Sequence, residues 1–356
     1  MEALVLGNQY ETLAILDTFE SLIWTDRYIG YGDFEVYFPA QNSAIKEMLV
    51  KGNYLSIKGS DRYMIVQDIK IKTDEENGDH ITVSGHSLES ILSRRIIWGQ
   101  TVLTGNFQDG IKKLLTENVI SPTNTARAIP NFTFKASTDT AITALTVDAQ
   151  FFGDNLYDSI LKLCTARDIG FKVLPSGDGG FEFSLYTGAD RSYTQDVLPH
   201  IVFSPNFDNL LTSDYSYSDD TFKNAAMAAG EGDGSARKLA EATLGSNVTG
   251  LNRYEMFVEA SDISQKVETV TLPDDVYLAQ LSEKGRQALS DTSVKETFEA
   301  TVDFKHQYVY GSDFFIGDIV QIQNEYGMES RVRMSELIQS QDNNGEAVTP
   351  TFATIT

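Results

Sequence analysis

Short segments in which apolar and polar residues alternate recur along the first hundred residues of this chain. The clearest is Phe34–Phe38, where large apolar side chains alternate with Glu35 and Tyr37 before Pro39 ends the segment. A period of two is the pattern of a β-strand with one buried face, and turn residues between such segments indicate a barrel or a sandwich. The pattern returns after residue 198, so we predict that the chain is rich in β-structure at both ends.

The middle of the chain has a helical period instead. Apolar residues in Phe107–Ile120 and in Asp154–Arg167 each fall on one helical face, and Asp154 is a candidate N-cap. The segments Gly170–Leu174 and Gly180–Leu185 are predicted to pair as a hairpin. Together these features predict a small α+β domain.

These patterns divide the chain into three parts: a β region over 1–100, an inserted α+β domain over 101–197, and a second β region over 198–356. The last part carries a loop and helix insertion at about 230–293. There, Gly230–Gly250 is rich in Gly, Ser and acidic residues, which predicts a mobile loop, and Val276–Leu289 has helical spacing. A further short helix is predicted at Ser43–Val50.

The balance of charge limits the possible partners. The chain has 28 basic and 51 acidic residues and a formal net charge of −23. A surface this acidic repels phosphate backbones, so tight binding of nucleic acid or anionic lipid is disfavoured, while simple solubility explains the surplus equally well. No apolar run approaches the roughly 20 residues that a membrane span requires, and we expect neither a span nor a secretion signal.

Residue types that bind metals are sparse. Cys164 is the single cysteine, which excludes an internal disulfide and a thiolate zinc cluster. No histidine has a histidine neighbour at the i, i+4 spacing of a helical metal site. The four histidines are His80, His86, His200 and His306. We therefore predict no metal site and no cofactor.

Two acidic motifs have structural interpretations. The segment Gly230–Gly234 reads GEGDG but lacks the Gly-Lys-Ser/Thr of a phosphate-binding loop, so we interpret it as a flexible loop. Asp342–Glu346 is too short for a calcium-binding loop and is predicted to be a β-turn.

Three other groups could be taken for catalytic residues. Asp219 and Asp220 are adjacent, and adjacent side chains on a strand point to opposite faces, unlike a glycosidase pair. Asp274 and Asp275 precede a predicted helix, where they stabilise its positive end. His86 and Ser87 adjoin Glu89 without a GxSxG turn, which favours a structural role. We predict no catalytic residue.

Three stretches, in this order, resemble the siphophage tail-tip family of Gp37-like proteins, relatives of the hub proteins of contractile-phage baseplates. The stretches are Ser21–Tyr28 with Gly32–Val36 and Pro39-Ala40; Ser84–Leu88 with Leu92 and Arg94–Ile97; and Tyr308–Phe314 with Gly317–Val320, Ser340–Asp342 and Pro350–Phe352. They span nearly the whole chain.

This resemblance implies a β-rich α+β fold with two tail-tube-like β-barrel domains and the inserted α+β domain. It also implies a homotrimeric ring, without enzymatic activity, at the tail tip or baseplate of a virion. Implied partners are the distal tail or tail-tube protein, the tape-measure protein, and receptor-binding or tail-fibre proteins. DNA would pass through the ring without tight binding.

Three other functions stay open. A tail-associated cell-wall or glycan hydrolase would require converging carboxylates or a metal site, and a carbohydrate-binding adhesin would require an exposed aromatic patch. A hub of a phage-derived injection machine would share the fold and carry no genome. If the chain forms a ring, we expect part of the acidic surplus to face the channel, with an outward-facing, solvating role as the alternative. The acids in question are Asp208, Asp214, Asp219 and Asp220.

Overall fold

The computed structural model of the chain describes residues 1–40, 49–73, 78–177, 179–267, 269–292, 295–302 and 307–355. The helix predicted at Ser43–Val50 lies outside these residues except for its last two positions.

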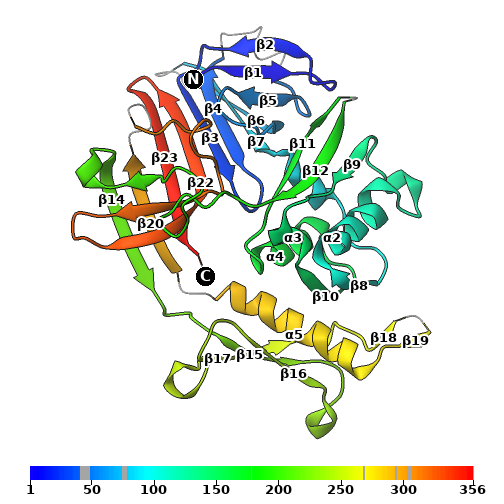
Figure 1. The fold of residues 1–356 in the computed structure, drawn as a ribbon. Helices are drawn as coiled ribbons and strands as arrows, with labels where there is room; N and C mark the ends of the chain where they lie inside the picture. The colour runs from blue at the N-terminus through cyan, green and yellow to red at the C-terminus, as the bar shows by residue number, and fades with distance from the viewer. Residues whose placement is uncertain are drawn as a thin grey trace.

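Thirteen strands form one large sheet (Figure 1). Its main path runs β14 (Leu210–Ser218), β20 (Lys295–Val302), β23 (Gly345–Thr354), β22 (Glu329–Asp342), β3 (Ser21–Arg27), β4 (Asp33–Pro39), β7 (His80–Ser87), β6 (Met64–Lys72), β5 (Tyr54–Ile57), β1 (Ala3–Leu6) and β2 (Thr12–Leu16). Two further strands, β21 (Ile319–Gln323) and β13 (Val202–Phe203), branch from β22. The chain is thus a β-rich α+β protein, as the sequence predicts.

The two β regions merge because β22 is long enough to pair with two strands along one edge. Its residues Glu329–Arg333 pair with β21, and Glu336–Asp342 pair with β3. Strands from opposite ends of the chain therefore lie side by side, β3 and β4 in blue beside β22 and β23 in red (Figure 1). Among the described residues the path is open at β14 and β2, and no closed barrel is found where two were expected.

Alternation along the strands buries one face of this sheet. Trp24, Phe34 and Phe38 pack with neighbouring apolar side chains beneath the strands of the first region. Phe203 and Phe352 belong to a second apolar cluster beneath the strands of the last region. The period of two seen in Phe34–Phe38 therefore corresponds to a strand with a buried and an open face, as predicted.

The middle of the chain forms a smaller α+β unit. Its elements are η1 (Leu88–Arg94), β8 (Thr101–Asn106), α2 (Phe107–Leu115), a π-helical turn (Thr116–Ile120), η3 (Thr125–Arg127), β9 (Phe132–Lys135), α3 (Thr140–Thr143), β10 (Thr146–Phe151), α4 (Leu156–Thr165), β11 (Gly170–Ser176) and β12 (Gly180–Tyr186). Both predicted helices and the predicted β11–β12 hairpin are confirmed. The core of this unit also contains Leu88, Ile91 and Leu92 of η1. The core is therefore continuous with the segment that precedes residue 101.

The N-cap of α4 differs from the prediction. The side chain of Asn155 accepts hydrogen bonds from the backbone N–H groups of Tyr157 and Asp158, at 3.0 and 3.3 Å. Asp154 instead accepts the backbone N–H of Phe152 at 3.2 Å. Both residue types are good N-caps, so composition alone could not choose between neighbours.

A third unit follows, built on helix α5 (Asp274–Ser290). Strands β15 (Ala225–Ala229), β16 (Leu239–Thr243) and β17 (Glu255–Glu259) form a sheet that packs on α5 (Figure 1). The connections of this unit contain η5 (Gly234–Ala236), η6 (Gly250–Asn252), β18 (Lys266–Val267) and β19 (Val270–Thr271), whereas η4 (Pro205–Phe207) lies between β13 and β14 of the large sheet. The prediction of a mobile loop over Gly230–Gly250 is wrong at Leu239–Thr243, because these residues form strand β16. The strand is alanine-rich, and Ala242 packs so closely on α5 that a Cβ on Gly285 would lie 3.0 Å from it.

Candidate functional site

The eight antiparallel strands from β14 to β6 have one open face. Directly paired residues share a face of a sheet. One continuous row of partners runs Asp68, Ser84, Glu35, Ile23, Ser340 and Ala347 across six strands. None of these six residues is buried. In the adjacent row, Val83, Val36 and Leu22 are fully buried.

We call this open surface the polar face. Its exposed or half-buried side chains are Ser21, Ile23, Glu35, Tyr37, Asp68, Lys70, Thr82, Ser84, Thr212, Asp214, Ser340, Asp342, Ala347 and Thr349. Most are short hydroxyl or acidic side chains, which hydrate well. They provide no cluster of basic residues to hold phosphate.

An ion cluster lies at one end of the polar face. Arg27 is the cross-strand partner of Glu336, and its Nε lies 2.7 Å from a carboxylate oxygen of that residue. The same guanidinium pairs with Asp33 on the neighbouring strand. The arginine thus links β22, β3 and β4, the strands at which the two β regions meet.

The four acids predicted for a channel lie in different settings. Asp214 is on β14, on the polar face, while Asp208 ends η4 in a left-handed conformation. Asp219 and Asp220 are exposed just after β14. What these four side chains would face in an assembly stays a prediction.

A buried charge cluster, which sequence reasoning missed, joins the first region to the middle unit. Arg62 and Glu89 are almost fully buried and form an ion pair. Arg62 also donates to the hydroxyl of Tyr186 at 2.8 Å, and Glu89 accepts the backbone N–H of Val173 at 2.9 Å. Breaking such a pair leaves a buried charge without its partner. The cluster therefore has a structural role, and the sole signal for it was an acidic residue within an apolar segment.

The residues weighed as catalytic candidates have structural partners. The hydroxyl of Ser87 accepts the backbone N–H of Gly32 at 2.8 Å and donates to Glu89. His86 contacts Gln67 through Nδ1 at 2.6 Å and packs edge-on against Tyr31. The two side chains therefore have different hydrogen-bond partners.

The acidic motifs also have local explanations. Asp274 lies in the first turn of α5, and the hydrogen bond from Lys238, then that from Gln265, holds the pKa of its carboxyl below the usual range. Asp342 accepts the backbone N–H of Asn344 at 2.7 Å, which lowers its pKa and forms the predicted turn. The GEGDG segment connects β15 to β16.

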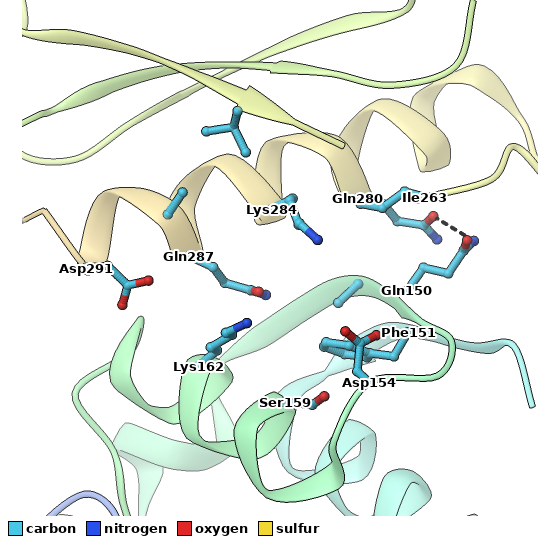
Figure 2. A pocket seen from close by; sticks show the side chains of 13 residues that line it. Gln150, Phe151, Asp154, Ser159, Lys162, Ile263, Gln280, Lys284, Gln287 and Asp291 are labelled. Carbon is cyan, nitrogen blue, oxygen red and sulfur yellow. Dashed lines mark hydrogen bonds between the residues drawn. The ribbon is translucent and has the colours of Figure 1, made fainter. Parts of the chain in front are cut away.

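A small pocket of about 120 Å³ lies between α4 and α5. Figure 2 shows Gln280, Lys284 and Gln287 of α5 facing Gln150 and Lys162 across it. Gln150 donates to Gln280 at 3.3 Å, whereas the amide nitrogen of Gln280 has no hydrogen-bond partner among the described residues. Asp154, Lys162, Lys284 and Asp291 also line the pocket, and we interpret it as a polar contact between two units.

The contact between the middle unit and α5 also contains a buried ion pair. The guanidinium of Arg167 meets the carboxylate of Glu283 on α5 through two hydrogen bonds, of 2.9 and 3.0 Å. Its geometry is bidentate, which fixes orientation as well as distance. In the part of the chain that the structure describes there is no cluster of metal-binding side chains, and no helix is long and apolar enough to span a membrane.

The profile of a family described as Siphovirus ReqiPepy6 Gp37-like protein matches residues 2–353. No curated protein matches the chain.

Three solved structures share its fold over 99% of its length. A tail protein from Neisseria meningitidis MC58 is 14% identical, with a TM-score of 0.59 over 95% of that protein. The 43 kDa tail protein of prophage MuSo2 from Shewanella oneidensis is 14% identical, with a TM-score of 0.60 over 98% of its chain. Prophage tail protein gp18 from Listeria monocytogenes EGD-e is 12% identical, with a TM-score of 0.56 over 94% of its chain.

Proposed function

Because this chain belongs to the Siphovirus ReqiPepy6 Gp37-like family, we propose that it is a structural, non-enzymatic protein of a phage tail, located at the tail tip or baseplate of the virion. The full-length structural similarity to three tail proteins supports a location in the tail. Zymography on Gram-positive and Gram-negative cell walls tests the non-enzymatic part. Clearing that disappears when one carboxylate is changed would instead assign a cell-wall or glycan hydrolase.

The specific role that we propose is a baseplate hub, a homotrimeric ring between the tail tube and the parts below it. The observation that carries this role is the eight-stranded sheet with one buried and one polar face. Strands β14, β20, β23 and β22 form one half of it, and β3, β4, β7 and β6 form the other. Two tube-like halves per chain give six similar units in a closed trimer, which suits a sixfold tube.

In this ring the polar face lines the channel through which DNA passes. Glu35, Asp68 and Asp342 are exposed there, and copies around a narrow ring would add their fields against the phosphates. A single exposed charge is screened over roughly 8 Å at physiological salt, so repetition is what makes the repulsion effective. Normal DNA ejection after all three are changed to Lys would show that these acids serve solubility alone.

The ring would contact the distal tail or tail-tube protein on one side and receptor-binding or tail-fibre proteins on the other, with the tape-measure protein at its opening. We keep the division into a tube-like unit over 1–100, an α+β unit over 101–197 outside the ring wall, and a tube-like unit over 198–356. Limited proteolysis of assembled particles tests it, because a unit outside the wall should be cut or released first.

Imaging of purified tails or concentrated protein tests the hub role directly. We expect rings with threefold symmetry and a mass of three copies, and a stable dimer would contradict the proposal. Packaged DNA in the particles that contain the ring separates a virion from a phage-derived injection machine.

A further inference from the structure

A tryptophan lies open on the surface of the middle unit. Trp98, just before β8, is 56% exposed, whereas Trp24, the other tryptophan of the chain, is fully buried. Exposure of a single apolar side chain is ordinary in a folded protein, so the surroundings of Trp98 decide what the ring can do.

Trp98 borders a pocket of about 530 Å³. This volume lies in the range of sites that hold small molecules. The polar side chains that line it are amides, hydroxyls, one carboxylate and one guanidinium, and they include Gln100, Glu117, Asn118, Thr123, Asn124 and Arg127. The pocket therefore combines one aromatic ring with many hydrogen-bonding groups.

The aromatic wall of the pocket is held in place by its neighbours. The guanidinium carbon of Arg127 lies 4.7 Å from the centre of the Trp98 ring. Arg127 also donates to the side-chain oxygen of Asn118 at 3.1 Å, and the amide nitrogen of Asn118 donates to the carbonyl of Leu114 at 2.9 Å. Asn118 is 2% exposed, so these contacts are fixed before any ligand arrives, which lowers the entropy cost of binding.

The helix that supplies Glu117 and Asn118 changes its geometry at this pocket. After α2 ends at Leu115, residues Thr116–Ile120 form a π-helical turn, in which the backbone N–H of Ser121 donates to the carbonyl of Thr116 at 2.9 Å. π-Helical turns are rare and occur frequently at functional sites. This irregular backbone points to the same pocket as the exposed ring does, and it is an independent observation.

The lining of the pocket limits the class of ligand. Glu117 and Arg127 carry opposite charges, so the pocket has no surplus of positive charge for a phosphate group. Trp98 is the single apolar side chain in the described lining, which is too little apolar surface for a lipid chain. A sugar ring fits both conditions, because its C–H groups pack on the face of an aromatic ring while its hydroxyl groups bond to amides and carboxylates.

We propose that this pocket binds a neutral carbohydrate, with one sugar ring stacked on Trp98 and its hydroxyl groups bonded to Gln100, Glu117 and Asn124. The site belongs to a single chain, so it does not depend on the proposed ring. In the tail we place the middle unit outside the ring wall, where the pocket is accessible to glycans of a bacterial surface.

Titration of the full chain with neutral oligosaccharides tests the site. The probes are oligomers of glucose, galactose, mannose and N-acetylglucosamine, together with purified bacterial wall polysaccharide. We expect at least one of them to change the tryptophan fluorescence, and because Trp24 is buried the change reports on Trp98. Affinity that stays constant as salt is raised supports a neutral ligand, whereas a steep loss would show an anionic ligand and overturn the proposed class. Binding of none of these probes would overturn the site.

Calorimetric titration of variants locates the bound sugar. Trp98→Ala should weaken binding at least about tenfold, and Trp98→Phe, which keeps an aromatic face, should weaken it less. Glu117→Gln keeps the size of the side chain and should also weaken binding. Tyr326→Ala removes another aromatic side chain, 83% exposed and outside the pocket, and is the matched control that should bind normally.

Thermal unfolding of each variant at the temperature of the unchanged chain shows that it is folded. If Trp98→Ala and Glu117→Gln both bind as tightly as the unchanged chain, the sugar lies elsewhere and the site proposed here is wrong. Rings that bind no sugar would overturn this site and leave the hub function standing. Sugar binding by a chain that forms no ring would support the site and contradict the hub function.

Discussion

Asp26 gives the stability of this protein a pH dependence that can be worked out from the structure. Its carboxylate is 1% exposed on the core face of β3 and accepts a hydrogen bond from the indole of Trp24 at 3.0 Å. Burial raises its pKa from 3.8 to about 6, although the nearby Arg62 acts in the opposite direction. A shift of about two pKa units corresponds to roughly 3 kcal/mol between the two protonation states.

The sign follows from which state binds the proton. Between pH 4 and pH 6 the folded chain keeps the Asp26 proton and the unfolded chain has lost it, so folding becomes less favourable as pH rises. Asp26→Asn keeps the shape and stays neutral at every pH. We expect the variant and the unchanged chain to be about equally stable at pH 4, and the variant to be more stable by up to about 3 kcal/mol at pH 8.

Denaturant unfolding from pH 4 to pH 8, followed by tryptophan fluorescence, measures this difference. Trp24 is fully buried beside Asp26, whereas the other tryptophan, Trp98, is 56% exposed, so the signal reports mainly on the relevant core. A stability difference that does not change with pH would refute the reasoning. An unchanged chain more stable than the variant at pH 8 would show that Arg62 outweighs burial.

Three further predictions concern buried contacts. Arg62→Met should cost about 3–5 kcal/mol of unfolding free energy, because it leaves the Glu89 carboxylate buried without its partner, and chemical denaturation measures the loss. A Cβ on Gly85 would lie 1.8 Å from the carbonyl oxygen of Ile65, so Gly85→Ala should cost roughly 3 kcal/mol by the same assay. Gly99→Ala, with no atom within 4 Å, should change it by less than about 0.5 kcal/mol. Burial also raises the pKa of the Cys164 thiol, so a thiol reagent should label it only after denaturant is added; rapid labelling of the folded chain would contradict its burial.

Local pattern was sufficient for several elements. The helix over Phe107–Ile120 and the hairpin of β11 and β12 follow from residues that are neighbours in the chain, and the structure confirms both. The turn at Asp342 is likewise set by side-chain contacts two residues apart. The strand β16 was missed because its alanines carry little hydrophobic signal, and only packing against α5 makes them core residues.

Local pattern could not predict the polar face or the buried Arg62–Glu89 ion pair. Alternation in Phe34–Phe38 predicts that one face of a strand is open, but it does not say which strands lie next to it. Likewise, nothing near Arg62 or Glu89 in the chain indicates that the two side chains meet, because they are 27 positions apart.

By itself, then, the sequence determined that the chain is rich in β-strands with one buried face, that helices occupy its middle, and that its acidic surface does not suit binding of phosphate. Only the tertiary structure decided that β22 joins β3, which turns two β regions into one sheet that is open among the described residues. The sequence pattern does not choose the partner of a strand, because every strand offers the same backbone hydrogen bonds. The choice of partner therefore depends on long-range packing and register, which a local pattern of residues does not contain.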